Sequence, residues 1–125
     1  MNTVPASDQH MLQQICQTIY DKKGFNTITL DVRPMATLTD YFVIAEGNVE
    51  KHVQTLAKEL QEVLREGGRS PIHVEGQRQG DWVVLDYSEV VVHLFIPDMR
   101  EKYQLEQLWQ QASIVDVPIH VTSRL

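Results

Sequence analysis

Trp82-Val-Val-Leu-Asp-Tyr-Ser-Glu-Val-Val-Val-His-Leu-Phe95 is the stretch that decides the fold of this chain of 125 residues. Two runs of β-branched and apolar residues flank a short turn, and this order predicts a β-hairpin with strands over 82–86 and 90–95. Side chains alternate along a strand, so Trp82 and Asp86 share a face. That face is expected to be partly exposed or to lie near loops, because a dry core does not accommodate an unpaired aspartate.

Periodic patterns on either side of the hairpin give the remaining elements. Strands are predicted over 27–31, 41–45 and 72–74, and the continuous apolar run 41–45 is typical of a strand buried on both faces. Two helices are predicted before the hairpin, one from a cap at Ser7 or Asp8 to Gly24, and one over 49–66 with Asn48 as its cap. A last helix is predicted to open at Pro97, with Leu105, Leu108, Trp109 and Ala112 on one side.

This order of elements predicts a single α/β domain with a mixed β-sheet of about five strands flanked by helices. The helix over 49–66 is long enough to form a right-handed crossover between strands. We assign the domain to residues 1–112 and a tail to residues 113–125, in which Pro118 lies between short apolar runs. Two placements of the tail stay open, as an edge strand of the sheet or as a loose segment on the surface.

The composition is that of a soluble globular protein, with 42% apolar and 22% charged residues. No apolar run approaches the roughly 20 residues that span a bilayer, and the first residues lack the basic and apolar regions of a signal peptide. Cys16 is the only cysteine. We expect it to be a buried thiol on the apolar face of the first helix. These features predict a cytoplasmic protein that does not bind a membrane.

The net charge of −6 makes this chain a poor candidate for binding RNA or DNA. Such affinity depends largely on basic side chains that neutralise phosphates, so we expect little or no direct nucleic-acid binding. From Glu75 to Glu106 there are seven acidic residues and three basic ones. If this segment is an interface, its charge favours a basic partner. Solubility is the competing interpretation of the same acids.

The titratable residues form no recognisable catalytic pattern. The five histidines are too widely spaced for a metal site, and His93 in its apolar strand is interpreted as a hydrogen-bonded structural residue. Asp31, Asp40 and Asp86 lie near strand ends, so a metal-dependent nucleotidyl or phosphoryl transferase built on these acids and His93 is the alternative hypothesis. The chain lacks a glycine-rich phosphate loop with a lysine, and it lacks a Gly-Ser opening followed by an Asp-x-Asp pair. We therefore predict no catalytic residues, no metal site and no cofactor.

Aromatic residues and one arginine are better candidates for function. Trp82, Tyr87, Arg100 and Tyr103 belong to the residue types that most often anchor protein interfaces, because these side chains are large, rigid and amphipathic. The competing interpretation is that Trp82 packs under the last helix and that Tyr103 completes the core.

The same segment carries a family resemblance. The matching blocks are Asp40-Tyr-Phe-Val-Ile-Ala-Glu-Gly47, His52, Glu75-Gly76, Trp82-Val-Val-Leu-Asp86, Val90-Val-Val-His93 and Arg100 with Tyr103-x-Leu105-Glu106-x-Leu108-Trp109. With this spacing the chain resembles the ribosomal silencing factor family, also called Iojap-like, from its first helix to Trp109. In the turn, Ser88-Glu89 replaces the usual Gly-Asp, and a serine there is expected to adopt no positive φ angle. Asn48-Val49 replaces the usual serine or threonine before the second helix.

The resemblance implies a function that requires no catalysis. Family members bind the large ribosomal subunit through its protein number fourteen, block its association with the small subunit and lower translation when nutrients are scarce. The implied fold is similar to that of nucleotidyltransferases without their catalytic residues. Resemblance and residue chemistry together predict as contacts Glu75, Trp82, Asp86, Tyr87, Arg100, Tyr103 and Glu106. A further hypothesis is a homodimer in which residues 115–121 pair across subunits.

Overall fold

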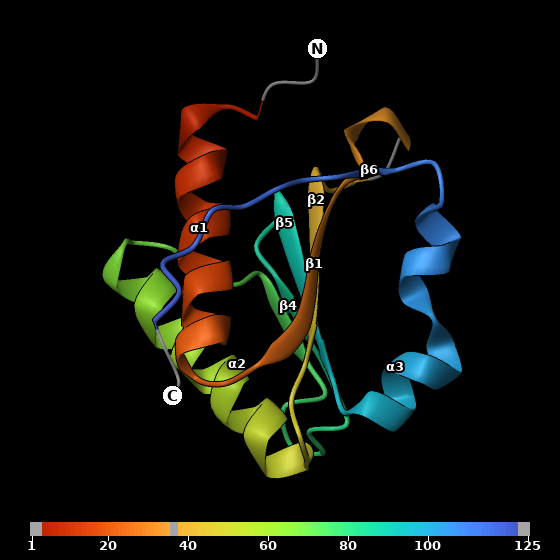
Figure 1. Cartoon of the computed structure of the whole chain (residues 1–125). Helices are drawn as coiled ribbons and strands as arrows, with labels where there is room; N and C mark the ends of the chain where they lie inside the picture. The colour runs from red at the N-terminus through yellow and green to blue at the C-terminus, as the bar shows by residue number, and fades with distance from the viewer. Residues whose placement is uncertain (1–3, 36–37, 123–125) are drawn as a thin grey trace.

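Six strands form one mixed β-sheet in the order β3-β4-β5-β2-β1-β6 in the computed structural model of the chain (Figure 1). The structure describes residues 4–35 and 38–122. The strands are β1 (Phe25–Asp31), β2 (Tyr41–Glu46), β3 (His73–Glu75), β4 (Trp82–Asp86), β5 (Val90–Phe95) and β6 (Ser113–Ile114). The helices are α1 (Ala6–Asp21), α2 (Glu50–Glu66) and α3 (Pro97–Tyr103), with short 3₁₀ helices η1 (Arg33–Met35) and η2 (Leu105–Trp109).

The single-domain α/β architecture predicted from the sequence is confirmed. β2 and β5 are parallel neighbours, and the other adjacent strands are antiparallel. Every residue of β2 is buried, as expected for a strand at the centre of a covered sheet. The sheet has six strands instead of about five, because residues 113–114 pair with β1. The first residues of the tail thus form an edge strand.

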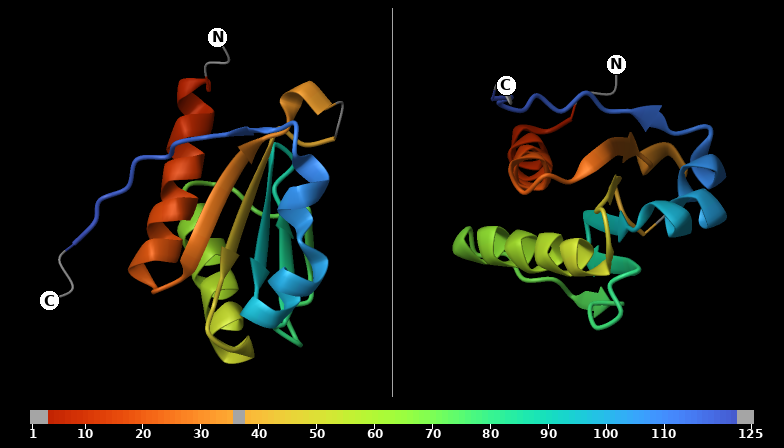
Figure 2. Two further views of the ribbon diagram at one scale, coloured as in Figure 1. Left: turned by 45° about the vertical axis from the view of Figure 1, so that its right-hand side comes forward. Right: turned by 60° about the horizontal axis from the view of Figure 1, so that its bottom comes forward.

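Helices cover the two faces of the sheet unequally. Helices α1 and α2 lie on one face, while α3 and η2 lie on the other (Figure 2). The main apolar core lies between the sheet and α1 and α2. A smaller core on the side of α3 contains Leu30, Val32, Phe42, Ile44 and Phe95. These residues belong to or follow β1, β2 and β5, and Trp82 of β4 and Met99 of α3 pack against them.

The starts of the first two helices differ from the predicted caps. Pro5 occupies the cap position of α1 and Val49 that of α2, and neither helix has a capping side chain. His52 acts at α2 instead, where its Nδ1 accepts the main-chain N–H of Asn48 at 2.9 Å. Its Nε2–H then donates to the main-chain oxygen of Lys22 at 2.8 Å. One neutral imidazole therefore ties the start of α2 to the end of α1.

The last helix is shorter than the sequence pattern predicted. Helix α3 ends at Tyr103 because Gln104 adopts the left-handed conformation, with φ 46° and ψ 50°. The chain then continues as η2 in a new direction. This break lets Leu105 and Ala112 pack against the smaller core. A continuous helix over these residues was the wrong prediction, because apolar spacing alone does not reveal a single left-handed residue.

The turn between β4 and β5 also differs from its prediction. Ser88 has a φ of 76°, in the left-handed region that the sequence analysis excluded. The main-chain N–H of Ser88 donates to Oδ1 of Asp86 at 2.8 Å, and that of Tyr87 donates to the main-chain oxygen of Val90 at 2.9 Å. These bonds hold a tight turn in a conformation that favours glycine.

The tail beyond β6 crosses the outer side of α1 (Figure 2). Val115, Val117 and Ile119 are partly buried against the main core. The side-chain amide of Gln17 donates to the main-chain oxygen of His120 at 3.0 Å and accepts its N–H at 2.7 Å, as a neighbouring strand would do. The segment up to Thr122 is therefore a packed part of the domain.

Within the described residues, none of the helices is both long and apolar enough to cross a membrane.

Candidate functional site

Trp82 is the centre of an aromatic cluster on the side of the sheet that carries α3. Its ring stacks on Phe95, with centroids 4.9 Å apart, and lies 5.0 Å from the ring of Tyr103. Trp82 itself is half-buried, whereas Tyr103 is 46% exposed. Trp82 therefore packs under α3, as one interpretation of the sequence expected, whereas Tyr103 presents an aromatic ring to solvent. The interface role of the two residues stays a prediction.

His93 lies beneath this cluster as a neutral structural residue. Its Nδ1 accepts the indole N–H of Trp82 at 3.1 Å, which places the imidazole proton on Nε2. Burial lowers the pKa of His93 to about 4, and the negative charge of Asp86 acts in the opposite direction. The buried Nε2 has no hydrogen-bond partner. The predicted role as a hydrogen-bonded core histidine is confirmed.

Acidic side chains lie beside the aromatic cluster on β3 and β4. Glu75 is opposite Val84 in the β3–β4 pair, and His73 is opposite Asp86. Glu75 is exposed, while Val84 and Asp86 are half-buried. Neither Glu75 nor Asp86 forms an ion pair in the described part of the chain. This face of β3 and β4 therefore carries unpaired negative charge next to exposed aromatic surface.

A hollow of about 300 Å³ opens between these two features. It is lined by Glu75, Gly76, Gln79, Asp81, Trp82, Val84 and Met99. Gly76 has a φ of 79°, and a Cβ there would collide with the main-chain oxygen of Trp82. A glycine is thus required for the 75–81 loop to approach the start of β4 and form one wall of the hollow.

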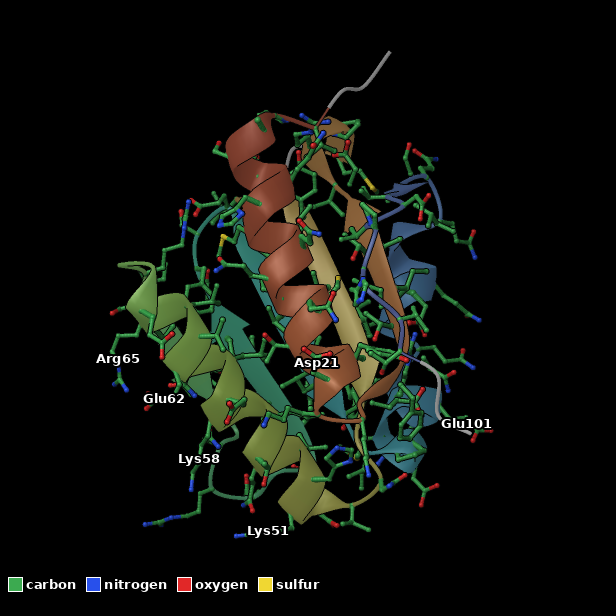
Figure 3. The ribbon with its side chains drawn as sticks, turned by 60° about the vertical axis from the view of Figure 1, so that its left-hand side comes forward. Asp21, Lys51, Lys58, Glu62, Arg65 and Glu101 are labelled. Atoms are coloured by element: carbon green, nitrogen blue, oxygen red, sulfur yellow. The ribbon has the colours of Figure 1, made fainter. Side chains whose placement is uncertain are left out.

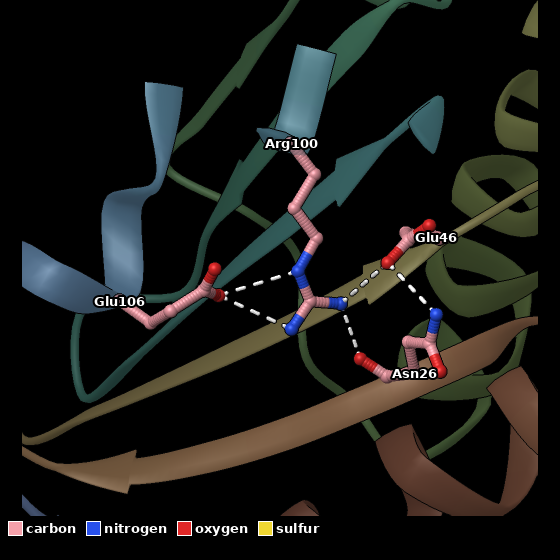
Figure 4. A network of polar contacts seen from close by, with 4 residues as sticks. All are labelled: Asn26, Glu46, Arg100 and Glu106. Carbon is pink, nitrogen blue, oxygen red and sulfur yellow. Dashed lines mark hydrogen bonds and ion pairs between the residues drawn. The ribbon is translucent and has the colours of Figure 1, made fainter. Parts of the chain in front are cut away.

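Arg100 and Glu106, both predicted as contacts, bind each other inside the protein (Figure 4). The Arg100 guanidinium lies 3.1 Å from Glu106 and 3.1 Å from Glu46, and it also donates to the main-chain oxygen of Asn26. Asn26 in turn donates to Glu46 at 3.1 Å. The Arg100 side chain is only 14% exposed. This network connects α3 and η2 to β1 and β2 near Asn26 and Glu46. Its first role is therefore to hold α3 and η2 in place beside Trp82.

Tyr87 is a correction to the predicted contact set. Its side chain is 4% exposed and belongs to the main core, and burial raises its pKa to about 12. The tight turn directs this ring to the face covered by α1 and α2, on the other side of the sheet from Trp82. Tyr87 therefore does not contribute to an exposed surface.

The residues of the alternative transferase hypothesis do not form a metal site. Two hydrogen bonds from the Arg33 side chain to Asp31, of 3.0 and 2.7 Å, lower the pKa of this carboxyl group. Asp86 accepts the turn N–H of Ser88, and His93 is bonded to Trp82. Among the residues that the structure describes, no group of three or more His, Cys, Asp or Glu could hold a metal ion.

Fold and site together define a small α/β protein that carries a partly exposed aromatic cluster and unpaired acids on one side of its sheet. The family model described as "Ribosomal silencing factor during starvation" matches residues 5–124, and the chain belongs to this ribosomal silencing factor family. The match extends beyond Trp109, where the sequence motifs end.

Individual relatives agree with this assignment. The chain is 39% identical to the ribosomal silencing factor of Halalkalibacterium halodurans over 89% of this chain and 95% of the relative. A crystal structure of a Chromobacterium violaceum protein, 32% identical, has a TM-score of 0.78 over 87% of this chain and 93% of that one. A mouse protein named "Mitochondrial assembly of ribosomal large subunit protein 1" is 33% identical over 70% of this chain and 40% of its own length.

Asp81, Gln79 and Met99 are residues of this face that sequence reasoning did not select. Asp81 precedes β4 directly, and its Oδ1 accepts the main-chain N–H of Trp82 at 3.0 Å. Asp81 directly precedes a predicted strand that starts with Trp82, and this position could have indicated that Asp81 lies beside Trp82. Met99 and Gln79 come from α3 and from the 75–81 loop, and nothing in the sequence indicated that these two segments meet beside Trp82.

Proposed function

We propose that the protein represses translation by binding the large ribosomal subunit through its protein number fourteen, and that it thereby prevents association with the small subunit when nutrients are limiting. The family membership and the printed names of its members support a role at the ribosome. The name of the mouse relative refers to the large subunit in particular. Such a role places the protein in the cytoplasm, where the ribosomes that it would silence are found.

The observation that carries this proposal is the position of an exposed aromatic ring, Tyr103 on α3, beside unpaired acids of β3 and β4. We call this surface, made of Glu75, Asp81, Trp82, Val84, Asp86 and Tyr103, the docking face. Aromatic residues anchor interfaces through burial of large rigid surfaces. The acids favour a basic partner and accelerate encounter with it.

Steric exclusion is sufficient for the proposed effect. A domain of 125 residues is roughly 35 Å across. A body of that size on the joining surface of the large subunit leaves no room for the small one. Binding to the free subunit and subunit joining are then mutually exclusive, and mass action shifts the population away from joined ribosomes. The protein acts as a binding regulator, and the proposal requires no chemical step.

We assign docking to the domain of residues 1–112 and a packing role to residues 113–122 of the tail. Val115, Val117 and Ile119 lie against the core of their own chain, on the side of α1, opposite the docking face. The proposal therefore requires a single copy of the protein. A dimer through this tail would have to replace these contacts with equivalent ones from a second copy.

A subunit-joining experiment tests the proposal. Purified large and small subunits are mixed with increasing amounts of the protein, and the fraction of joined ribosomes is measured on sucrose gradients. We expect the protein to sediment with free large subunits and the joined fraction to fall at saturation. Unchanged joining in the presence of saturating protein would exclude the function.

A competition arm addresses the partner. Isolated ribosomal protein fourteen, added in excess, is expected to release the protein from large subunits. If isolated protein fourteen does not release the protein at concentrations far above those of the subunits, the assignment of this partner is wrong. The sucrose gradient still tests whether the protein binds elsewhere on the large subunit.

A further inference from the structure

The hollow beside Trp82 differs in charge from the larger hollows of the protein. Hollows of about 560 and 400 Å³ flank the tail, and Asp116 is the one charged residue among those lining them. The hollow of about 300 Å³ on the docking face is lined by two acids, Glu75 and Asp81, and by no basic residue. Neither acid forms an ion pair within the described residues.

The walls of this hollow have two chemical characters. Trp82, Val84 and Met99 supply apolar surface on the sheet side and from α3. Glu75, at the end of β3, and Asp81, before β4, bracket the loop that forms the opposite wall. Asp81 uses one carboxylate oxygen to accept the N–H of Trp82, which fixes its side chain and leaves the second oxygen available.

We propose that this hollow receives one lysine or arginine side chain of the ribosomal partner, an inference that rests on the function proposed above. Basic side chains bury an aliphatic stem along apolar surface and keep the charged head among polar groups. The stem would pack against Trp82 and Met99, and the head would bind the carboxylates of Glu75 and Asp81. Two acids and no basic residue line the hollow, which disfavours a phosphate group as the occupant, since like charges repel.

The orientation of Trp82 supports a side chain lying against the edge of the indole. Phe95 stacks on the ring at 4.9 Å, and Tyr103 lies at 5.0 Å with a tilt of 39°. The indole N–H is committed to His93. Trp82 is therefore held rigidly by three neighbours, and the surface that it offers to a partner side chain is already in place before binding, which lowers the entropic cost of docking.

Removal of the two charges provides the first test. The double variant Glu75→Gln/Asp81→Asn keeps the shape of both side chains, and the amide introduced at position 81 retains an oxygen for the N–H of Trp82. The control is Glu62→Gln/Glu66→Gln, which also removes two acids, both of them exposed on α2. Figure 3 shows Glu62 on this helix, which lies on the other side of the sheet from α3. Dissociation constants for purified large subunits are measured over a range of salt concentrations, with melting temperatures as a check of folding.

We expect the docking-face variant to bind about tenfold more weakly than the unchanged protein and with a shallower salt dependence. The α2 control is expected to bind within about twofold of it. If the unchanged protein binds large subunits and the docking-face variant matches it in affinity and salt dependence, this inference is overturned while the proposed function stands. If the unchanged protein does not bind large subunits, the proposed function itself fails.

Filling the hollow provides a second test that leaves the acids in place. Val84→Phe adds an aromatic ring to the half-buried strand position at its floor. We expect this variant to bind at least about fivefold more weakly, because the partner side chain and the new ring would occupy the same volume. Val84→Thr, which is close to valine in size, is the control. Equal binding by the phenylalanine variant would show that nothing enters the hollow.

Discussion

The indole N–H of Trp82 donates to Nδ1 of His93 over 3.1 Å, across the β4–β5 pair. The bond fixes the imidazole as a neutral acceptor and keeps the most prominent aromatic residue of the docking face in one orientation. Protonation of Nδ1 would abolish it. The stability of the fold and the geometry of the surface are thus connected through one hydrogen bond.

Stability should consequently decline in weakly acidic solution. His93 has a pKa of about 4 in the folded protein, below its ordinary value of 6.5. Above pH 6.5 it is neutral in both states and contributes no pH dependence. Between pH 6.5 and about 4 the unfolded chain takes up a proton that the folded one does not, which costs on the order of 3 kcal/mol.

Denaturant unfolding from pH 7 to pH 4 measures this loss. His93→Gln retains an oxygen acceptor for Trp82 but cannot titrate, so its stability should fall less across this window. Asp31 acts in a different pH range. Its pKa in the folded protein is below the ordinary value of 3.8, so the stability that it contributes is lost only as the pH falls below 3.8. If the unchanged protein and His93→Gln lose stability equally between pH 7 and pH 4, His93 is not the cause of the loss.

Tyr103→Ala should weaken binding to large subunits by about 2 kcal/mol, or roughly thirtyfold. The ring is 46% exposed, so its removal subtracts an interface anchor and disturbs the core little. Titration of labelled protein with purified large subunits measures the effect. Tyr20→Ala, on α1 across the sheet, is the control and should leave affinity unchanged. Equal affinities for both variants would remove Tyr103 from the docking face.

Arg100→Met should destabilise the fold by about 3 kcal/mol, because Glu46, whose side chain is 9% exposed, loses its cationic partner. Equilibrium unfolding measures the loss. The exposed neighbour Lys102 on the same helix supplies the control, Lys102→Met, with an expected change below about 0.5 kcal/mol. Adding Glu46→Gln to the arginine variant should restore part of the stability. A double variant as unstable as the sum of the single ones would show that the two residues act independently.

Ser88→Gly should stabilise the protein by about 0.5 kcal/mol, in contrast to most glycine substitutions. Ser88 has a φ of 76°, and glycine adopts this region without the steric cost that a Cβ imposes. The gain is partly offset by the greater freedom of glycine in the unfolded chain. Ser70→Gly, at a position without positive φ, is the matched control and should lower stability. Thermal or denaturant unfolding measures both variants. A loss of stability in Ser88→Gly as large as that in Ser70→Gly would contradict the prediction.

Tyr87→Phe should raise stability by about 1 kcal/mol and leave ribosome binding unaltered. Its hydroxyl group is buried without a hydrogen-bond partner, and removing an unsatisfied polar group from a core relieves its desolvation cost. Unfolding curves and subunit affinity are measured on the same preparation. Weaker binding without loss of stability would place Tyr87 back among the contacts.

Local pattern was sufficient for most of the fold. The hairpin over 82–95, the buried strand from Tyr41 and the stripe of α2 are dictated by side-chain alternation and helical spacing, which are properties of neighbouring residues. The break at Gln104 and the positive φ of Ser88 were not predictable in this way. The break at Gln104 accompanies the packing of Leu105 against the smaller core. The positive φ of Ser88 is held within the turn by the hydrogen bond from its main-chain N–H to Asp86, and neither side-chain alternation nor helical spacing reports such a bond.

The residues predicted as contacts lie in different surroundings, and only some of these surroundings follow from local pattern. Trp82 and Glu75 lie where strand alternation places them. Arg100 and Tyr87 were chosen by the family resemblance and by residue type, and neither distinguishes an exposed guanidinium from one enclosed by two carboxylates. Besides Glu106, the partners of Arg100 are Glu46 and the main chain of Asn26, which are far away in sequence, so only the folded structure reveals its internal role.

The two hydrogen bonds between the side chain of Gln17 and the main chain of His120 are useful for measuring affinity for the large subunit. They anchor the tail on the α1 side, where Val121 is 66% exposed. A biotin or a fluorophore attached through a cysteine at position 121 would project away from β3 and β4. Immobilised or labelled in this way, the protein should present its aromatic and acidic surface freely to an object as large as a ribosomal subunit.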